Sequence, residues 1–253
     1  MRVDSLLSFI RTADRPERTL ALVNRTVPRP FQTLLEETFE DQGIVVREAA
    51  VPDEAADVLY LLDGDDLVAT SPLSTLQETV LLVNSDLYIT STRGFDDLEL
   101  PAVIEELAET RFSLRGYPES NKEKLLLIVL SRCIERLALD GDGGTLRASF
   151  QRLSRLRDEL GTREVYERLG ETNTDVHVYG VPDRSPAIDA LSVHGGESTE
   201  YRDSWFVVYA PASPEAEHAA LVAIETAPRE WDAVWTFDPE TVRAVDAYIA
   251  ATL

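Results

Sequence analysis

The sequence predicts an α+β protein made of two α/β-type units with mixed sheets. The first part of the chain has a βαβ-like pattern. Residues 120–140 form the most apolar sustained helical pattern of the whole sequence. Several β-rich runs and a last amphipathic helix follow that pattern. We predict a first unit at 1–100 and a second at 101–253, with the boundary near 91–118. The second unit should be a sheet of about five strands, packed by the central helix and a C-terminal helix.

The first unit is expected to mix strands and helices. Its hairpin has the clearest signal, because two β-rich runs at 58–62 and 67–70 flank a turn that contains Gly64. The expected elements are a helix at 4–12, a strand at 19–24, a helix at 31–39, a strand at 44–48, the hairpin, a helix near 74–82 and a strand at 87–90.

The central helix at 120–140 should be covered on several sides. Ser120 is a suitable N-cap, and Glu123 stands where a capping box requires it. Apolar residues cover most of the circumference, so the polar side chains fall on one narrow stripe. This pattern predicts that Arg132→Gln is tolerated. The stripe consists of Ser131, Arg132, Glu135 and Arg136.

The rest of the second unit is expected to alternate again between helices and strands. Helical spacing at 150–160 predicts a helix, and Thr162 is the expected N-cap of the next one, at 164–169. The run 175–181 is apolar on both faces and predicts an interior strand. Asp238 and Pro239 predict the start of the last helix. Further strands are expected at 145–148, 191–193, 205–210, 219–226 and 233–237.

The charge balance excludes some partners. The net charge of -22 comes from 46 acidic residues against 22 arginines and two lysines. Such a field repels phosphates and anionic lipid, so direct binding to nucleic acid or to a membrane is disfavoured. A lysine-poor, acid-rich surface is typical of halophilic archaea, where salt screens the repulsion; an ordinary acidic protein is the alternative.

Redox and targeting signals are sparse. Cys133 is the only cysteine and lies in the apolar part of the central helix, so we expect an inert thiol without a disulfide. The apolar run at residues 6–10 is too short for a secretory signal, and the expected location is the cytoplasm.

A search for catalytic and metal-binding patterns finds little. The chain has no phosphate-binding loop, no HExxH pair and no complete calcium loop, so no catalytic residue or metal ligand is predicted, and the sequence leaves any cofactor unknown. His194-Gly195-Gly196 resembles a hydrolase oxyanion loop, but the G-x-S-x-G elbow that would hold the nucleophile is missing.

One set of residues suggests a ligand site. Arginines three residues apart on a predicted helix share one face, and aromatic residues from neighbouring elements could wall a pocket for an anionic or planar ligand. The alternative is that the rings are core and the arginines pair with local acids. The candidate ligand-binding residues are Gln151, Arg152, Arg155, Tyr166, Tyr179, Trp205 and Trp235.

Four separated motifs resemble the DICT sensory domain of diguanylate cyclases and two-component proteins. They are FQRLSRL at 150–156, VHVYGVPD at 176–183, SWFVVY at 204–209 and WTFDPE at 235–240. The resemblance spans about 121–253. Segments 81–90 and 111–127 resemble the upstream region of stand-alone haloarchaeal members. The family supplies no established ligand or catalytic residues to carry over.

The resemblance implies a noncatalytic sensory module of signal transduction that binds a small-molecule signal. Because the chain has no cyclase or kinase motif, its output should be a partner signalling protein, and oligomerisation stays open. The alternative is an enzyme, for example a hydrolase, with an unrecognised site that uses His194 or carboxylates.

Overall fold

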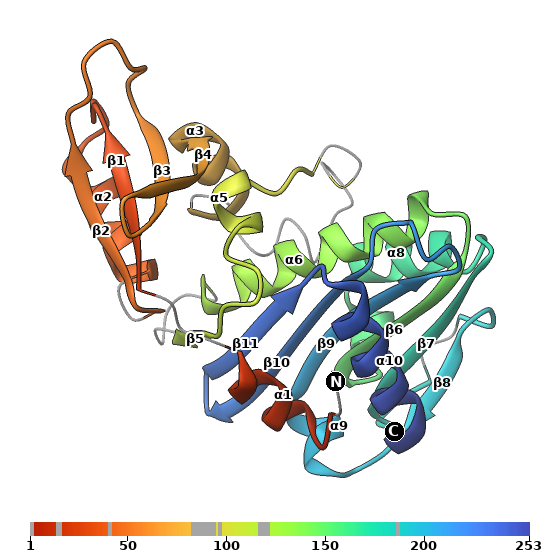
Figure 1. The fold of residues 1–253 in the computed structure, drawn as a ribbon. Coiled ribbons are helices and arrows are strands. Elements are labelled where there is room, and N and C mark those ends of the chain that lie inside the picture. The colour runs from red at the N-terminus through yellow and green to blue at the C-terminus, as the bar shows by residue number, and fades with distance from the viewer. Residues whose placement is uncertain are drawn as a thin grey trace.

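The computed structural model describes residues 3–13, 17–39, 42–81, 95, 98–115, 122–185 and 188–253. It contains a four-stranded sheet and a seven-stranded sheet with helices packed on them, which confirms the α+β class (Figure 1). Two predicted features, the strand at 87–90 and the N-cap Ser120, lie outside the described residues.

The smaller sheet confirms the βαβ start and the hairpin. Its strand order is β2-β1-β3-β4, and β1 and β2 run parallel with α2 between them in sequence. β3 and β4 pair antiparallel across a tight turn in which Gly64 has φ +60°. The elements are β1 Arg18–Val23, α2 Arg29–Phe39, β2 Ile44–Ala49, β3 Val58–Asp63, β4 Asp66–Pro72, α3 Leu73–Leu76 and the π-helix η2 Gln77–Leu81.

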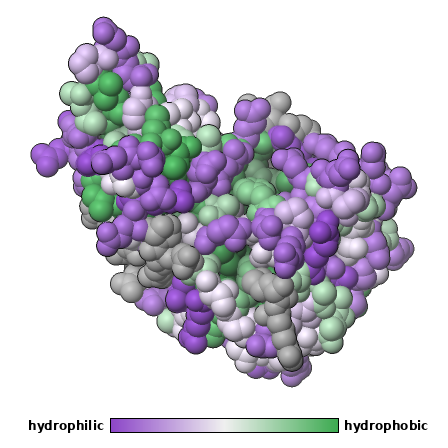
Figure 2. All heavy atoms as spheres, in the orientation of Figure 1, coloured by the Kyte–Doolittle hydropathy of each residue, from purple (hydrophilic) through white to green (hydrophobic). Residues whose placement is uncertain are grey.

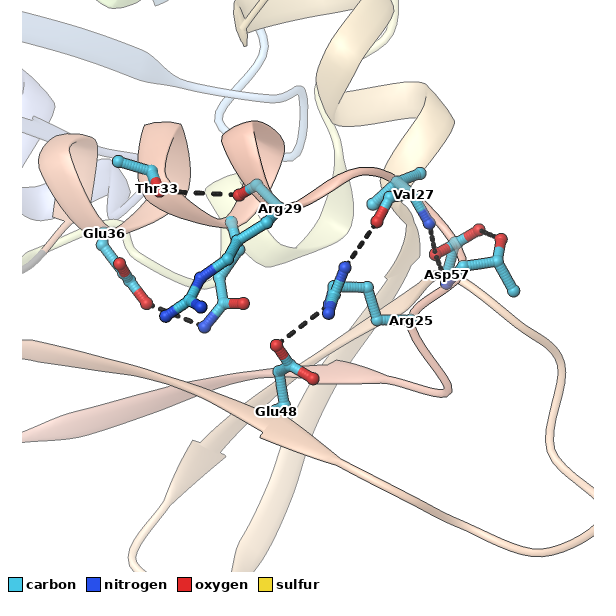
Figure 3. Close-up of polar contacts among 9 residues, drawn as sticks. Arg25, Val27, Arg29, Thr33, Glu36, Glu48 and Asp57 are labelled. Carbon is cyan, nitrogen blue, oxygen red and sulfur yellow. Dashed lines mark hydrogen bonds and ion pairs between the residues drawn. The ribbon is translucent and has the colours of Figure 1, made fainter.

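Polar contacts fix the loop between β1 and α2 (Figure 3). The Asp57 carboxylate accepts from the backbone N–H groups of Thr26 and Val27, at 2.7 and 3.1 Å. Desolvation acts to raise the pKa of Asp57, but these bonds and the nearby Arg25 charge outweigh it and lower that pKa. Arg25 donates to the Glu48 carboxylate and to the Val27 carbonyl, at 2.9 and 2.7 Å. The charge of Arg25 is therefore already satisfied.

The larger sheet has seven strands, where the sequence predicted about five. Its order is β5-β11-β10-β9-β6-β7-β8, with parallel pairing between β6, β7 and β8 and antiparallel pairing elsewhere. The short strand β5 lies in the segment 91–118, where the sequence predicts the boundary between the two units. The strands are β5 Phe112–Arg115, β6 Gly144–Arg152, β7 Thr174–Val181, β8 Ser192–Gly195, β9 Ser204–Pro211, β10 Ala219–Ala227 and β11 Glu230–Thr236.

Helices cover both faces of the larger sheet (Figure 1). Along β10, Leu221 and Ala223 join the core under α6, whereas Ala220 and Val222 join the core under α10. The Asp238 side chain accepts from the Thr241 backbone at 2.8 Å, which confirms the predicted start of the last helix. The helices of the described chain outside the smaller unit are α1 Leu6–Thr12, α5 Ala102–Glu105, α6 Lys122–Asp140, α7 Arg155–Asp158, α8 Leu160–Leu169, α9 Thr199–Asp203 and α10 Pro239–Thr252.

The first helix, α1, packs on the larger sheet beside α10. Leu6, Phe9 and Ile10 are buried in the same core cluster as α10. Glu200 links the two helices, because it accepts from the Leu6 backbone at 3.2 Å and from the Tyr248 hydroxyl at 2.9 Å. Residues 4–12, assigned to the first unit by sequence, thus contact the second sheet; the division near residue 100 stays a prediction.

The predicted helix at 150–160 is right only at Arg155–Asp158, which form the short helix α7. Residues 150–152 extend β6, because Arg152 pairs with Val181 of the neighbouring strand β7. Phe150, Leu153 and Leu156 have helical spacing in the sequence, but a bulge in β6, where Gln151 has φ +58°, keeps Phe150 and Gln151 in the strand. The predicted N-cap Thr162 is also wrong, since α8 begins at Leu160 with Glu159 as N-cap.

Among the described helices, none has the length and apolar character needed to cross a bilayer.

Candidate functional site

A cavity of about 530 Å³ lies where β6 and β7 end. The two strands are parallel, so their carboxyl ends reach the same edge of the sheet. Three predicted ligand residues, Gln151, Arg152 and Arg155, line this cavity together with Val181. The other lining residues, which the sequence interpretation missed, are Asp183, Arg202, Asp203 and Glu225.

The bulge in β6 shapes one wall of the cavity. The β6–β7 register shifts between Ser149 and Arg152, so two residues of β6 fall between regular pairing positions. Bulges of this kind redirect side chains at the margins of binding sites. Gln151 is 8% exposed, and its Nε2 lies 3.5 Å from Glu225 Oε2 across the sheet. A local irregularity therefore brings β6 and β10 to one site.

The arginines of the cavity are held loosely. Arg155 Nε is 4.0 Å from Glu159 Oε1, and an Arg202 nitrogen is 3.7 Å from Glu197 Oε2. The Arg152 side chain has no hydrogen bond or ion pair with any residue that the structure describes. Ion pairs at these distances and exposures are weak, so the guanidinium groups are available to a ligand.

Two of the three carboxylates that line the cavity accept hydrogen bonds from nearby residues. Ser154 donates its N–H and hydroxyl to the Asp183 carboxylate, at 2.9 and 2.7 Å. Desolvation acts to raise the pKa of Asp183, but these bonds outweigh it and lower the pKa. Glu225 accepts from the Arg229 backbone at 3.0 Å. Asp203 is half-buried and has no side-chain partner within the described ranges.

The four predicted aromatic residues do not line the cavity. Tyr166 and Tyr179 are buried, with hydroxyl contacts to Glu135 and Arg147 respectively. Trp205 donates its indole N–H to Ser131 at 2.9 Å, and Trp235 packs against Phe112 with ring centroids 4.8 Å apart. Each ring is therefore occupied by other contacts, as the core interpretation expects.

A buried polar cluster joins α6 to α8, and we call it the interface network. An Arg132 nitrogen is 2.6 Å from Glu135 Oε2, and a second Arg132 nitrogen donates to Thr162 Oγ1 at 2.8 Å. The Tyr166 hydroxyl donates to Glu135 at 3.0 Å, and Thr162 donates to Glu159 at 3.1 Å. Burial and the Glu135 charge raise the pKa of Tyr166 well above its usual value.

The interface network corrects the expectation of a replaceable polar stripe. Arg132 and Glu135 are only 5% and 2% exposed, so neither group faces solvent. The opposite charges stand three residues apart on one helix, a spacing that was readable in the sequence. What the sequence did not show was that α8 covers them.

The histidines form a second cluster, on β7 and β8. His177 Nε2 is 3.0 Å from the Asp175 carboxylate, and His177 Nδ1 is 3.0 Å from His194 Nε2. The His194 ring stacks on Tyr179 with centroids 4.4 Å apart. Burial, then the His177 and Arg147 charges, lower the pKa of His194. Within the described ranges, no hydroxyl or thiol forms a hydrogen bond with His194.

Two features bear on metal and redox chemistry: the grouping of possible metal ligands and the surroundings of the single cysteine. The described part of the chain contains no group of three or more His, Cys, Asp or Glu side chains arranged to hold a metal ion. Burial, which outweighs the nearby Arg136 charge, raises the pKa of Cys133 to about 12. Its thiolate is therefore scarce at neutral pH, in agreement with an inert thiol.

The motifs at the ends of β6 and β7 lie within a segment that is similar to a known protein family. Residues 102–225 match the DICT family model. The family is described as a sensory domain in diguanylate cyclases and two-component systems. All residues that line the cavity fall inside this DICT region, so the cavity belongs to the part of the chain that is similar to a sensory domain.

No curated protein matches the chain. A crystal structure of polyphosphate kinase from Porphyromonas gingivalis aligns with 96% of this chain at 11% identity and a TM-score of 0.32. The chain spans 44% of that kinase chain. A TM-score this low supports no inference about fold or activity.

Proposed function

We propose that the chain is a noncatalytic sensory module whose signal is a small anionic molecule bound in the cavity of the DICT region. The observation that carries the proposal is the group of loosely held arginines, Arg152, Arg155 and Arg202, around one cavity. Guanidinium groups suit carboxylate or phosphate ligands, because their planar fork can donate two parallel hydrogen bonds.

A chain of contacts supports an output route from the cavity to the central helix. Arg155 lies 4.0 Å from Glu159, which accepts from Thr162, which in turn accepts from Arg132 of α6. A ligand that draws Arg155 away from Glu159 would change the partners of Glu159 at the start of α8. The proposed receiver of that change is a partner signalling protein, as the DICT match suggests for a sensory region.

The proposal also concerns where the protein works. The excess of 46 acidic residues with only two lysines supports a cytoplasmic protein of a halophilic archaeon, related to the stand-alone haloarchaeal DICT proteins. Salt screening would then offset the repulsion from the net charge of -22.

Thermal unfolding with pyrophosphate as the anionic probe, at fixed KCl concentration, tests the function. The probe should raise the melting temperature of the unsubstituted chain, because a ligand that binds only the folded state stabilises it. Arg155→Gln should abolish most of this rise. Arg157→Gln is the matched control, because Arg157 lies on the same short helix, is exposed and does not line the cavity.

Two results would count against the proposal. A rise that survives Arg155→Gln would place anion binding elsewhere on the protein. Cleavage of pyrophosphate, followed by phosphorus NMR, would favour the enzyme alternative over a noncatalytic sensor.

A further inference from the structure

Two opposite charges in the cavity have no partner in the described structure. Arg152 stands at the end of β6, and Asp203 at the end of α9. Both line the cavity, and neither side chain makes a hydrogen bond or ion pair with a residue in the described ranges. The other charged lining residues each have at least one such contact, as described above.

The fold keeps these two charges apart. Arg152 and Asp203 belong to elements separated in sequence, and they do not approach each other within the 4.0 Å of an ion pair. The cavity therefore presents a positive and a negative group that a single bound molecule could span.

We infer that the signal is a small zwitterion, with a phosphate or carboxylate held by Arg152 and Arg155 and an amine held by Asp203. The inference rests on the proposed function and deepens it. A cavity of about 530 Å³ is within the range of small-molecule sites in proteins.

The lining favours a zwitterion over the other ligand classes. Three arginines face three carboxylates, so the formal charge of the lining sums to zero. A simple polyanion should bind less tightly than a zwitterion, because Asp183, Asp203 and Glu225 and the net negative charge of the protein offset part of its attraction to the arginines. A planar aromatic ligand would find no aromatic side chain to stack on among the described residues that line the cavity.

The test uses matched small probes on the full chain at fixed KCl concentration. O-phosphoethanolamine carries an anionic phosphate and a cationic amine, whereas inorganic phosphate is only anionic and ethanolamine is only cationic. β-Alanine is also zwitterionic, so it distinguishes a carboxylate from a phosphate ligand. Isothermal titration calorimetry measures binding, and circular dichroism confirms that each variant is folded.

We expect at least one zwitterion to bind at least tenfold more tightly than phosphate or ethanolamine. Asp203→Asn should reduce its affinity to that of the anion alone, and Arg152→Gln should reduce it toward that of ethanolamine, with Arg155 as the remaining cation for the anionic group. Arg157→Gln should leave the affinity unchanged, because Arg157 lies outside the lining.

The inference would be overturned if phosphate bound as tightly as O-phosphoethanolamine and β-alanine bound no better, or if Asp203→Asn left zwitterion affinity unchanged. In those cases, anion binding that still requires Arg155 would remain consistent with the proposed anion site. Failure of every probe to bind would overturn the zwitterion inference, and the pyrophosphate experiment would then judge the anion site separately.

Discussion

Arg132 in the interface network and Arg155 at the cavity are both helical arginines with a carboxylate nearby, but their surroundings differ. The Arg132 side chain is 6% exposed and lies 2.6 Å from Glu135, with Thr162 as a second partner. The Arg155 side chain is 32% exposed and lies 4.0 Å from Glu159. A buried charge requires its partners, whereas an exposed charge keeps water as an alternative partner.

The difference separates a structural arginine from a candidate ligand-binding one. Removing a partner at the α6–α8 interface leaves a buried charge without compensation. Removing Arg155 leaves Glu159 with solvent and Thr162. Four substitutions test this contrast, from the largest expected effect to the smallest.

An unpartnered charge at α6 should have the largest effect. Leu127 is fully buried in the same helix as Arg132, and Leu127→Asp would place a carboxylate there without a partner. The cost of several kcal/mol is a large part of a total stability of about 5–15 kcal/mol, so we expect loss of folding. Circular dichroism and size-exclusion chromatography measure it. A folded variant with normal melting would show that α6 is not enclosed.

Arg132→Gln should cost about 3–5 kcal/mol of unfolding free energy, because Glu135 would remain buried without its cationic partner. Denaturant unfolding measures this cost. The double variant Arg132→Met/Glu135→Leu is the control, since removing both charges should restore much of the stability. A loss for Arg132→Gln below about 1 kcal/mol would contradict the importance of the network.

Asp183, at the cavity, should make a smaller contribution that depends on pH. Because its folded-state pKa is lowered, its stabilising effect is present above the unfolded value of about 3.9 and is lost as pH falls through the folded value. Asp183→Asn should flatten the acid side of the stability profile, measured by unfolding at decreasing pH. The exposed Asp189→Asn serves as control. Parallel profiles for Asp183→Asn and the original chain would refute this assignment.

Arg155→Gln should change the stability of the unliganded protein least, by less than about 1 kcal/mol. Raising the KCl concentration should shrink this difference further, because salt screens exposed pairs. The loss caused by Arg132→Gln should persist in the same salt series, since its pair is buried. A large, salt-independent loss of stability for Arg155→Gln would make that residue structural and contradict its proposed role in ligand binding.

Local signals in the sequence determined many of the elements. Gly64 supplies the left-handed turn of the β3–β4 hairpin, and Asp238 caps α10 as its spacing to Thr241 predicts. The apolar pattern at 120–140 gave the central helix, observed at Lys122–Asp140. These features depend on residues within a few positions of each other, which a single sequence contains in full.

Only the tertiary structure decided the extent of β6 and the placement of the aromatic rings. Residues 150–152 begin a run of apolar residues with helical spacing, but the pairing of Arg152 with Val181 of β7 makes them part of a strand. Tyr179 lies in the core under α10, whereas Tyr166 and Trp235 lie in the core under α6. Periodicity shows that a side chain is buried but not which face of a sheet receives it, because that depends on packing with distant segments.

Some residues of the candidate site could be predicted from the sequence, and others only from the tertiary structure. The sequence alone grouped Gln151, Arg152 and Arg155, which do meet at one cavity, although on a strand end and a short helix. Asp203 and Glu225 join them only because α9 and β10 pass that edge of the sheet. Whether an arginine is enclosed, as Arg132 is, or open, as Arg155 is, depends on which helix covers it. That cover comes from long-range packing, which residue spacing does not encode.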